Sequence, residues 1–166
     1  MELNKVPPHN LEAELSVLGA LMLEPETAST VFEILKPDDF YRDNHRHIFA
    51  AIQDLFEKGE PIDLVTVAEN LNRSGRLEQI GGIATIAEIA QAVPSAANVE
   101  HYAQIVAEKS LMRQLIKASS AIAEKGYDPG EEARSLLEEA ERMVLELSQK
   151  QTKRGLTSIR TLLLNT

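Results

Sequence analysis

The feature that most constrains the fold is a long stretch, Asn98–Lys125, that contains neither glycine nor proline. Because these two residues are the main breakers of helices, the stretch predicts one helix of about 40 Å at 1.5 Å per residue. The next residues, 126–130 (GYDPG), predict a chain reversal. A second long helical pattern follows from about Glu131 to Lys150. Two long helices joined by a short turn form an antiparallel hairpin.

Apolar residues occur on more than one face of the first hairpin helix. One face can pack against the second helix. The remaining apolar surface needs another cover, which a second copy of the chain would provide most economically. We therefore expect self-association through apolar residues of both helices: Leu111, Met112, Leu115, Leu136, Leu137 and Val144.

The residues before the hairpin are predicted to form a compact head of short helices. Asn10 is a suitable cap for a helix that ends near Leu23. The segment 64–67 (LVTV) has the composition of a strand, but the spacing of its apolar residues up to Leu71 is helical. We expect a head over residues 1–97, a hairpin over 98–150, and a linker with the start of a linker helix over 151–166.

The composition agrees with helices packed on helices. Apolar residues make up 43% of the chain, whereas aromatic residues make up only 4% and tryptophan is absent. Leu, Ile, Val and Ala must therefore fill the core, as in helical bundles. The predicted fold is all-α: a globular head of short helices followed by a long antiparallel helical hairpin and the start of a linker helix.

Charge and cysteine content limit the partners and the compartment. The formal net charge is −9. Affinity for nucleic acid comes largely from Lys and Arg contacts with phosphates, so we expect no strong direct DNA binding. Cysteine is absent, which suits a reducing compartment. No apolar run approaches the roughly 20 residues of a membrane span, and we expect a cytoplasmic protein without membrane contact.

The last residues differ from the hairpin. Segment 149–155 (QKQTKRG) is polar and basic and ends in glycine, which is typical of a linker. A new helical pattern then starts near Thr157. Since the sequence ends before this helix could bury an apolar face, we expect the chain to be a piece of a longer protein.

Residues that could carry chemistry are few and poorly arranged for it. His45 and His47 are two residues apart, which on a helix places them about 200° apart around the axis, so there they cannot share a metal ion. On an irregular turn they could, but no third ligand has suitable spacing. Asp38 and Asp39 follow a proline and suit a turn. No phosphate-binding loop or nucleophile motif is present. We expect no catalytic, cofactor or metal residue.

Eight short sequence pieces, each weak alone, occur in one order and at fitting separations. They are 6–14 (VPPHNLEAE), 17–20 (VLGA), 39–41 (DFY), 48–49 (IF) after His45 or His47, 59–67 (GEPIDLVTV), 80–82 (IGG), 92–100 (AVPSAANVE) and 102–110. Together they resemble the N-terminal domain of the bacterial replicative DNA helicase family, DnaB. The resemblance covers nearly the whole chain.

The resemblance implies a function in DNA replication. In this family such domains pair, and trimers of dimers form a collar on a hexameric ring. The segment from Thr157 would begin the linker helix. The RecA-like domain, which binds ATP and Mg and drives 5′-3′ unwinding, is absent from this sequence, so the resemblance implies a helicase for the parent protein and no enzyme for this chain.

The resemblance also implies partners and docking residues. The family's collar binds the C-terminal domain of primase, and helicase loaders are further partners that it suggests. By position, the primase-docking residues would be Glu12, Thr85, Ile116 and Ile122. Two alternatives stay open: a free-standing helical adaptor or regulator without a motor domain, and, ranked last, a metal-dependent hydrolase built around His45 and His47.

Overall fold

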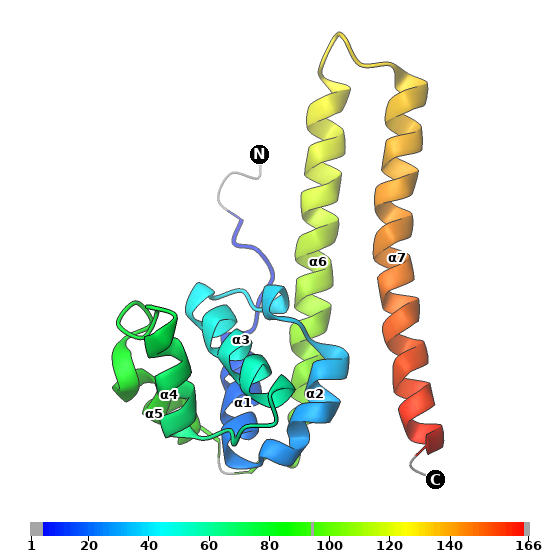
Figure 1. The fold of residues 1–166 in the computed structure, drawn as a ribbon. Helices are drawn as coiled ribbons and strands as arrows, with labels where there is room; N and C mark the ends of the chain where they lie inside the picture. Colours follow the sequence, from blue (N-terminus) through cyan, green and yellow to red (C-terminus); the bar gives the residue numbers. More distant parts are fainter. Residues whose placement is uncertain (1–4, 94, 165–166) are drawn as a thin grey trace. The chain divides into compact units, whose positions relative to one another are not determined.

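The structure, a computed structural model, describes residues 5–93 and 95–164, with the backbone alone for residues 152–162. Over these residues it contains seven α-helices and no strand, which confirms the all-α fold (Figure 1). The helices are α1 (Leu11–Leu23), α2 (Ala28–Ile34), α3 (Asp43–Glu57), α4 (Leu64–Arg73), α5 (Gly82–Ala90), α6 (Val99–Gly126) and α7 (Ala133–Leu164). Two short 3-10 helices lie at Pro25–Thr27 and Pro37–Asp39.

The chain divides into two compact units, and the boundary differs from the predicted one. The head unit is His9–Ser110, and the hairpin unit is Leu111–Thr166 together with Met1–Pro8. The sequence placed the boundary at 97/98, before α6. The first part of α6 instead belongs to the head, because Ala103, Val106 and Ala107 are buried in the head core.

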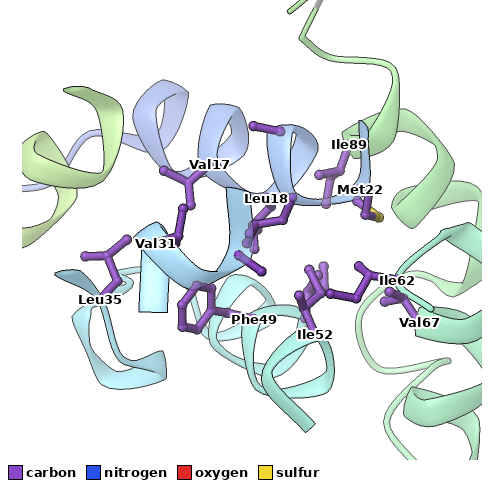
Figure 2. Close-up of a cluster of buried hydrophobic side chains, with 14 of the residues drawn as sticks. Val17, Leu18, Met22, Val31, Leu35, Phe49, Ile52, Ile62, Val67 and Ile89 are labelled. Carbon is purple, nitrogen blue, oxygen red and sulfur yellow. The ribbon is translucent and has the colours of Figure 1, made fainter. Parts of the chain in front are cut away.

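Helix α1 is the central element of the head. Residues Ser16–Met22 are all buried, so this helix packs on every side rather than along one face. Side chains from α1 to α5 converge on it, as Figure 2 shows for ten labelled residues. The ring of Phe49 lies between two others, with its centroid 4.9 Å from that of Phe32 and 4.7 Å from that of Phe40.

Helix starts in the head follow local capping chemistry. The Asn10 side chain accepts a hydrogen bond from the Ala13 N–H at 2.9 Å, as the sequence predicted. The Asp63 side chain does the same for the Thr66 N–H at the start of α4. The LVTV segment is therefore helical, and Val67 points into the core (Figure 2).

The hairpin unit contains residues 111–126 of α6, a turn, and α7. The predicted linker is not present, because α7 continues as one helix from Ala133 to Leu164, through Gly155. Gln, Lys and Arg in segment 149–154 are good helix formers. A single glycine costs only about 1 kcal/mol in a helix interior, which is too little to end a helix that continues on both sides.

None of the described helices combines the length and the apolar character that crossing a membrane requires.

Candidate interaction surface

The two arms of the hairpin unit meet near the turn. Residues 111–126 of α6 and the start of α7 run in opposite directions, side by side (Figure 1). The Lys125 ammonium donates a hydrogen bond of 2.6 Å to Glu139 Oε1. A Cβ built on Gly126 would lie 3.8 Å from Leu136 Cδ2, an ordinary van der Waals contact. The hydrogen bond joins α6 to α7 close to the reversal, where Gly126 also faces Leu136.

One stripe of α6, formed by Leu111, Leu115, Ala118 and Ile122, is partly covered in the structure. Ala118 is buried, whereas Leu111, Leu115 and Ile122 are half-buried. Among the described side chains of the hairpin unit, Ala118 is the only buried apolar residue. The hairpin therefore leaves part of even its inner face accessible.

A second stripe of α6 is exposed along its length. Met112, Ile116, Ser119 and Ala123 follow one another at intervals of four and three residues, so they share one helical face. All four are exposed, with 48% of Met112 and 50% of Ile116 accessible. A face of this kind, made of small and apolar residues at heptad-like intervals, is suited to packing against another helix.

Helix α7 presents apolar side chains on two sides. Leu137 and Val144 are seven residues apart and thus on one face, and they are 61% and 51% exposed. Leu136 is half-buried. Leu145, which is 56% exposed, lies about 80° from Leu137 around the helix.

The six residues predicted to mediate self-association thus fall into two groups. Met112, Leu137 and Val144 are exposed, while Leu111, Leu115 and Leu136 are half-buried. Their role in self-association stays a prediction. The exposed group is available to a partner without any change in the hairpin.

The four residues predicted for primase docking are divided between the units. Glu12 is exposed in the first turn of α1, and Thr85 is half-buried in α5. The Thr85 hydroxyl donates a hydrogen bond to the Gly81 carbonyl at 3.1 Å. Ile116 and Ile122 belong to the hairpin unit. The docking role of these residues also stays a prediction.

Thr85 and Ile122 each line a groove. The groove in the head, of about 280 Å³, includes Thr85, Arg42, Asn44 and Glu88 on its wall, but not Glu12. The groove in the hairpin unit, of about 440 Å³, brings Ile122 together with Leu136 and Leu137. In the hairpin unit, a predicted docking residue and two predicted self-association residues thus meet in one concave surface.

The Lys125–Glu139 pair is an electrostatic contact between the arms of the hairpin. The hydrogen bond from Lys125 lowers the pKa of Glu139, and the same bond raises the pKa of Lys125. The two side chains are 47% and 28% accessible, so water and salt screen most of their attraction.

A buried acid–histidine pair in the head was missed at the level of sequence. Glu14 in α1 is only 2% accessible, and its Oε1 lies 2.8 Å from Nδ1 of His45, which is 5% accessible. The Glu14 carboxylate also accepts hydrogen bonds from the backbone N–H groups of Tyr41 and Arg42. It therefore fixes the start of α3 against α1.

A second buried carboxylate joins the 3-10 helix at Pro37–Asp39 to α6. Asp39 Oδ1 accepts a hydrogen bond of 2.8 Å from the Ser110 hydroxyl, and Asp39 Oδ2 accepts one of 2.7 Å from the Lys36 N–H. The sequence had assigned Asp39 to a turn and Ser110 to mid-helix. Both placements hold, but the bond between them spans 71 residues.

The two neighbouring histidines have separate partners. His45 is paired with Glu14, whereas His47 lies 3.2 Å from Asp43 and also contacts the Arg76 guanidinium at 3.0 Å. Within residues 5–93 and 95–151, no group of three or more His, Asp or Glu side chains is arranged to hold a metal ion. These polar residues organise the head.

Comparison with known proteins identifies the family. The family model of the DnaB-like helicase N-terminal domain matches residues 6–108. The chain belongs to this family. The replicative DNA helicase DnaC of Bacillus subtilis is 44% identical over 163 residues, which are 98% of this chain. The chain spans 36% of the length of that protein.

Solved structures of DnaB-like proteins agree with the fold. The N-terminal domain of DnaB helicase from Mycobacterium tuberculosis matches with a TM-score of 0.81 and 40% identity, over 85% of this chain and 99% of that one. A structure of a DnaB-like replicative helicase and its interactions with primase matches with a TM-score of 0.68 and 28% identity, over 83% and 31% of the two chains. The DnaB-like architecture therefore includes the hairpin as well as the head.

Proposed function

We propose that this chain is the N-terminal collar and assembly domain of a replicative DNA helicase. It mediates pairing of subunits, as dimers and trimers of dimers in a hexameric ring, and it docks primase during DNA replication. The observation that carries the proposal is the exposed stripe of α6, with Met112 and Ile116 half accessible on a DnaB-like domain. Apolar residues exposed at helical intervals mark interaction surfaces.

The parent protein would be an ATP-dependent 5′-3′ DNA helicase that acts in the cytoplasm. The relatives that support this are replicative DNA helicases. The chain spans 36% of the length of the one from Bacillus subtilis. ATP and Mg would act in a RecA-like motor domain, and this chain would hold neither. Helicase loaders are further proposed partners. The net charge of −9 argues against strong DNA binding by this domain.

The primase-docking role centres on Ile116 and Ile122 of α6. A DnaB-like replicative helicase has been solved with its interactions with primase, which supports primase as the partner here. Ile116→Asp places a charge on the exposed stripe, where half of the native side chain is accessible. If the residue is a hot spot, the variant should lose about 2 kcal/mol of binding energy, or roughly 30-fold in affinity.

The experiment measures binding of the primase C-terminal domain to this chain and its variants by calorimetry. Val65→Asp is the matched control, because Val65 is 67% exposed on α4 of the head and belongs to none of the predicted docking residues. Circular dichroism checks that helicity is retained. Equal affinity of the native chain, Ile116→Asp and Ile122→Asp would move the docking site elsewhere.

Self-association is tested separately by sedimentation of the chain over a range of concentrations. We expect dimers or larger species, and we expect Met112→Asp to shift the population toward monomers because a charge would be buried in the interface. A chain that remains monomeric at about millimolar concentration, well above the Kd of weak specific interfaces, would contradict the pairing role.

A further inference from the structure

The groove in the head is formed by helices α1, α3 and α5. Its apolar wall carries Leu15, Ile48 and Ile89, one from each of these helices. Its volume is about 280 Å³, which is the space of about nine water molecules at about 30 Å³ each. All of the residues named here belong to the head unit, so the groove is a feature of one folded body and has the size of a small molecule.

One nitrogen of the buried His45 ring opens into this groove. The His45 side chain is only 5% accessible, and its Nδ1 lies 2.8 Å from Glu14 Oε1. The Glu14 carboxylate can only accept hydrogen bonds, as it does from the N–H groups of Tyr41 and Arg42. Nδ1 of His45 is therefore the donor in this pair, and in the neutral ring Nε2 carries the lone pair.

The Nε2 atom is left available for a ligand. Within the part of the chain that the structure describes, the bond from His45 Nδ1 to Glu14 is the only side-chain hydrogen bond of that ring. Every described side-chain nitrogen or oxygen that the protein encloses completely has a partner. Nε2 is therefore not enclosed, and the groove that His45 lines gives access to it.

Two opposite charges line the same groove without pairing. Arg42 precedes the first turn of α3, Glu88 lies on α5, and both are exposed. Neither side chain has an ion pair or a hydrogen bond among the residues that the structure describes. The half-buried Asn44 adds an amide, which both donates and accepts, to the wall. The groove therefore combines a cation, an anion, an amide and a ring nitrogen with an apolar wall.

We propose that this groove binds a small zwitterion with an apolar side chain, the chemistry of an aliphatic α-amino acid. The ligand carboxylate accepts hydrogen bonds from the Arg42 guanidinium and the Asn44 amide. The ligand ammonium donates to the Glu88 carboxylate and to Nε2 of His45. The aliphatic part of the ligand covers the apolar wall, as expected of a pocket in which a few polar groups fix the orientation of an apolar body.

Other classes of ligand match the groove less well. A polyanion such as a nucleotide would face the Glu88 carboxylate, and Arg42 is the only Lys or Arg among the described lining residues. A wholly apolar ligand would cover Nε2 of His45 without giving it a donor, which costs binding energy. No contact of the zwitterion requires Thr85, so the inference goes beyond the proposed function and does not depend on primase docking.

The test is a titration of the isotope-labelled chain with L-leucine, followed by NMR. Amide signals of Asn44 and Glu88 should shift saturably, with a Kd of about 1 mM or lower. The Nε2 signal of His45 should shift in the same titration, because that atom accepts from the ligand. Isocaproate lacks the ammonium and isoamylamine lacks the carboxylate, so each should bind at least about tenfold more weakly than leucine.

Two pairs of variants locate the site. Glu88→Gln and Arg42→Gln each remove one of the two charges, and each should weaken leucine by about tenfold or more. Glu69→Gln and Arg73→Gln remove the same charges from exposed positions on α4 and should leave its affinity unchanged. Because all four side chains are exposed, the variants should keep the fold, which their amide spectra check directly.

Several results would overturn the proposal. Absence of saturable shifts at about 50 mM leucine, well above a Kd of about 1 mM, would reject the site. Equal binding of leucine and of either half-ligand would reject a zwitterion as its ligand. Equal effects of Glu88→Gln and Glu69→Gln, or an unchanged His45 Nε2 signal, would place the ligand elsewhere. None of these outcomes bears on subunit pairing or on primase, so the proposed function stands or falls separately.

Discussion

The head buries most of its large apolar side chains, whereas the hairpin unit leaves many of its own exposed. In the head, large side chains such as Phe40, Phe49 and Leu18 are fully buried, and two buried carboxylates are held by hydrogen bonds from other elements. In the described part of the hairpin unit, Ala118 is the only buried apolar residue, while Leu137 is 61% exposed. The head is complete as a folded unit, whereas the hairpin keeps apolar surface for contact.

This difference separates residues that maintain the fold from residues that maintain assembly. Buried groups contribute to the free energy of unfolding through packing and paired charges. Exposed groups contribute little until a partner covers them, after which binding adds to stability by mass action. We therefore expect the same type of substitution to have large effects on stability in the head and small ones in the hairpin.

The largest effect is expected at Glu14. Glu14→Ala removes the partner of buried His45 and leaves the Tyr41 N–H without its acceptor, so the free energy of unfolding should fall by about 3 kcal/mol or more. Urea unfolding measures the change. Glu12→Ala, in the same turn of α1 but exposed, should cost about 0.5 kcal/mol or less. If both variants lost a similar free energy of unfolding, burial of Glu14 would not explain its contribution to stability.

Two helical glycines give the next test. A Cβ on Gly19 would lie 2.7 Å from both the Ile89 carbonyl oxygen and Val93 Cγ2, so α1 and α5 would have to separate. Gly19→Ala should destabilise the head by about 1–3 kcal/mol, despite the better helix propensity of alanine. Gly126→Ala meets only Leu136 Cδ2 at 3.8 Å and should be neutral or slightly stabilising. Thermal unfolding of both variants measures the contrast, and a loss at Gly126 as large as at Gly19 would contradict it.

The head could be predicted from sequence where the signal is local. Asn10 and Asp63 cap their helices with their own side chains, so the starts of α1 and α4 follow from neighbouring residues. The Glu14–His45 pair is different, because its partners are 31 residues apart. In the sequence, an acid in the first turn of a helix is explained equally well by the helix dipole, so the sequence does not single out Glu14 as buried.

In the hairpin, the helices themselves could be predicted from the sequence, but the end of α7 and the exposure of single residues could not. Its two helices and turn follow from the absence of breakers, and DnaB-like relatives confirm the family. The predicted linker was wrong because polar composition was taken for a break, whereas α7 continues as one helix through Gly155. The division of the self-association residues into exposed Met112 and half-buried Leu111 depends on the packing of two helices, which spacing alone leaves open.

A smaller effect is expected at the join between α6 and the 3-10 helix of the head. Ser110→Ala removes the hydroxyl that donates to Asp39 Oδ1. The free energy of unfolding should fall by about 1–2 kcal/mol, because a buried carboxylate oxygen loses a hydrogen bond. Ser119→Ala, an exposed serine of the same helix, is the control and should change stability by about 0.5 kcal/mol or less. Chemical denaturation compares the two serines, and equal losses would show that α6 is not held in the head through Ser110.

The smallest effect is expected for the Lys125–Glu139 pair of the hairpin. The hydrogen bond from Lys125 lowers the pKa of Glu139 from its ordinary 4.5, so the stabilisation is present above pH 4.5 and is lost as the pH falls through the lowered pKa. The bond to Glu139 raises the pKa of Lys125 from 10.5, so the stabilisation is also lost as the pH rises through that raised pKa. Lys125→Met should lower Tm slightly at neutral pH, and the difference should vanish in about 1 M salt. A difference that persists in salt or at low pH would mean that Lys125 packs its carbon chain in the hairpin, and the hairpin would then resemble the head more closely than its exposed residues indicate.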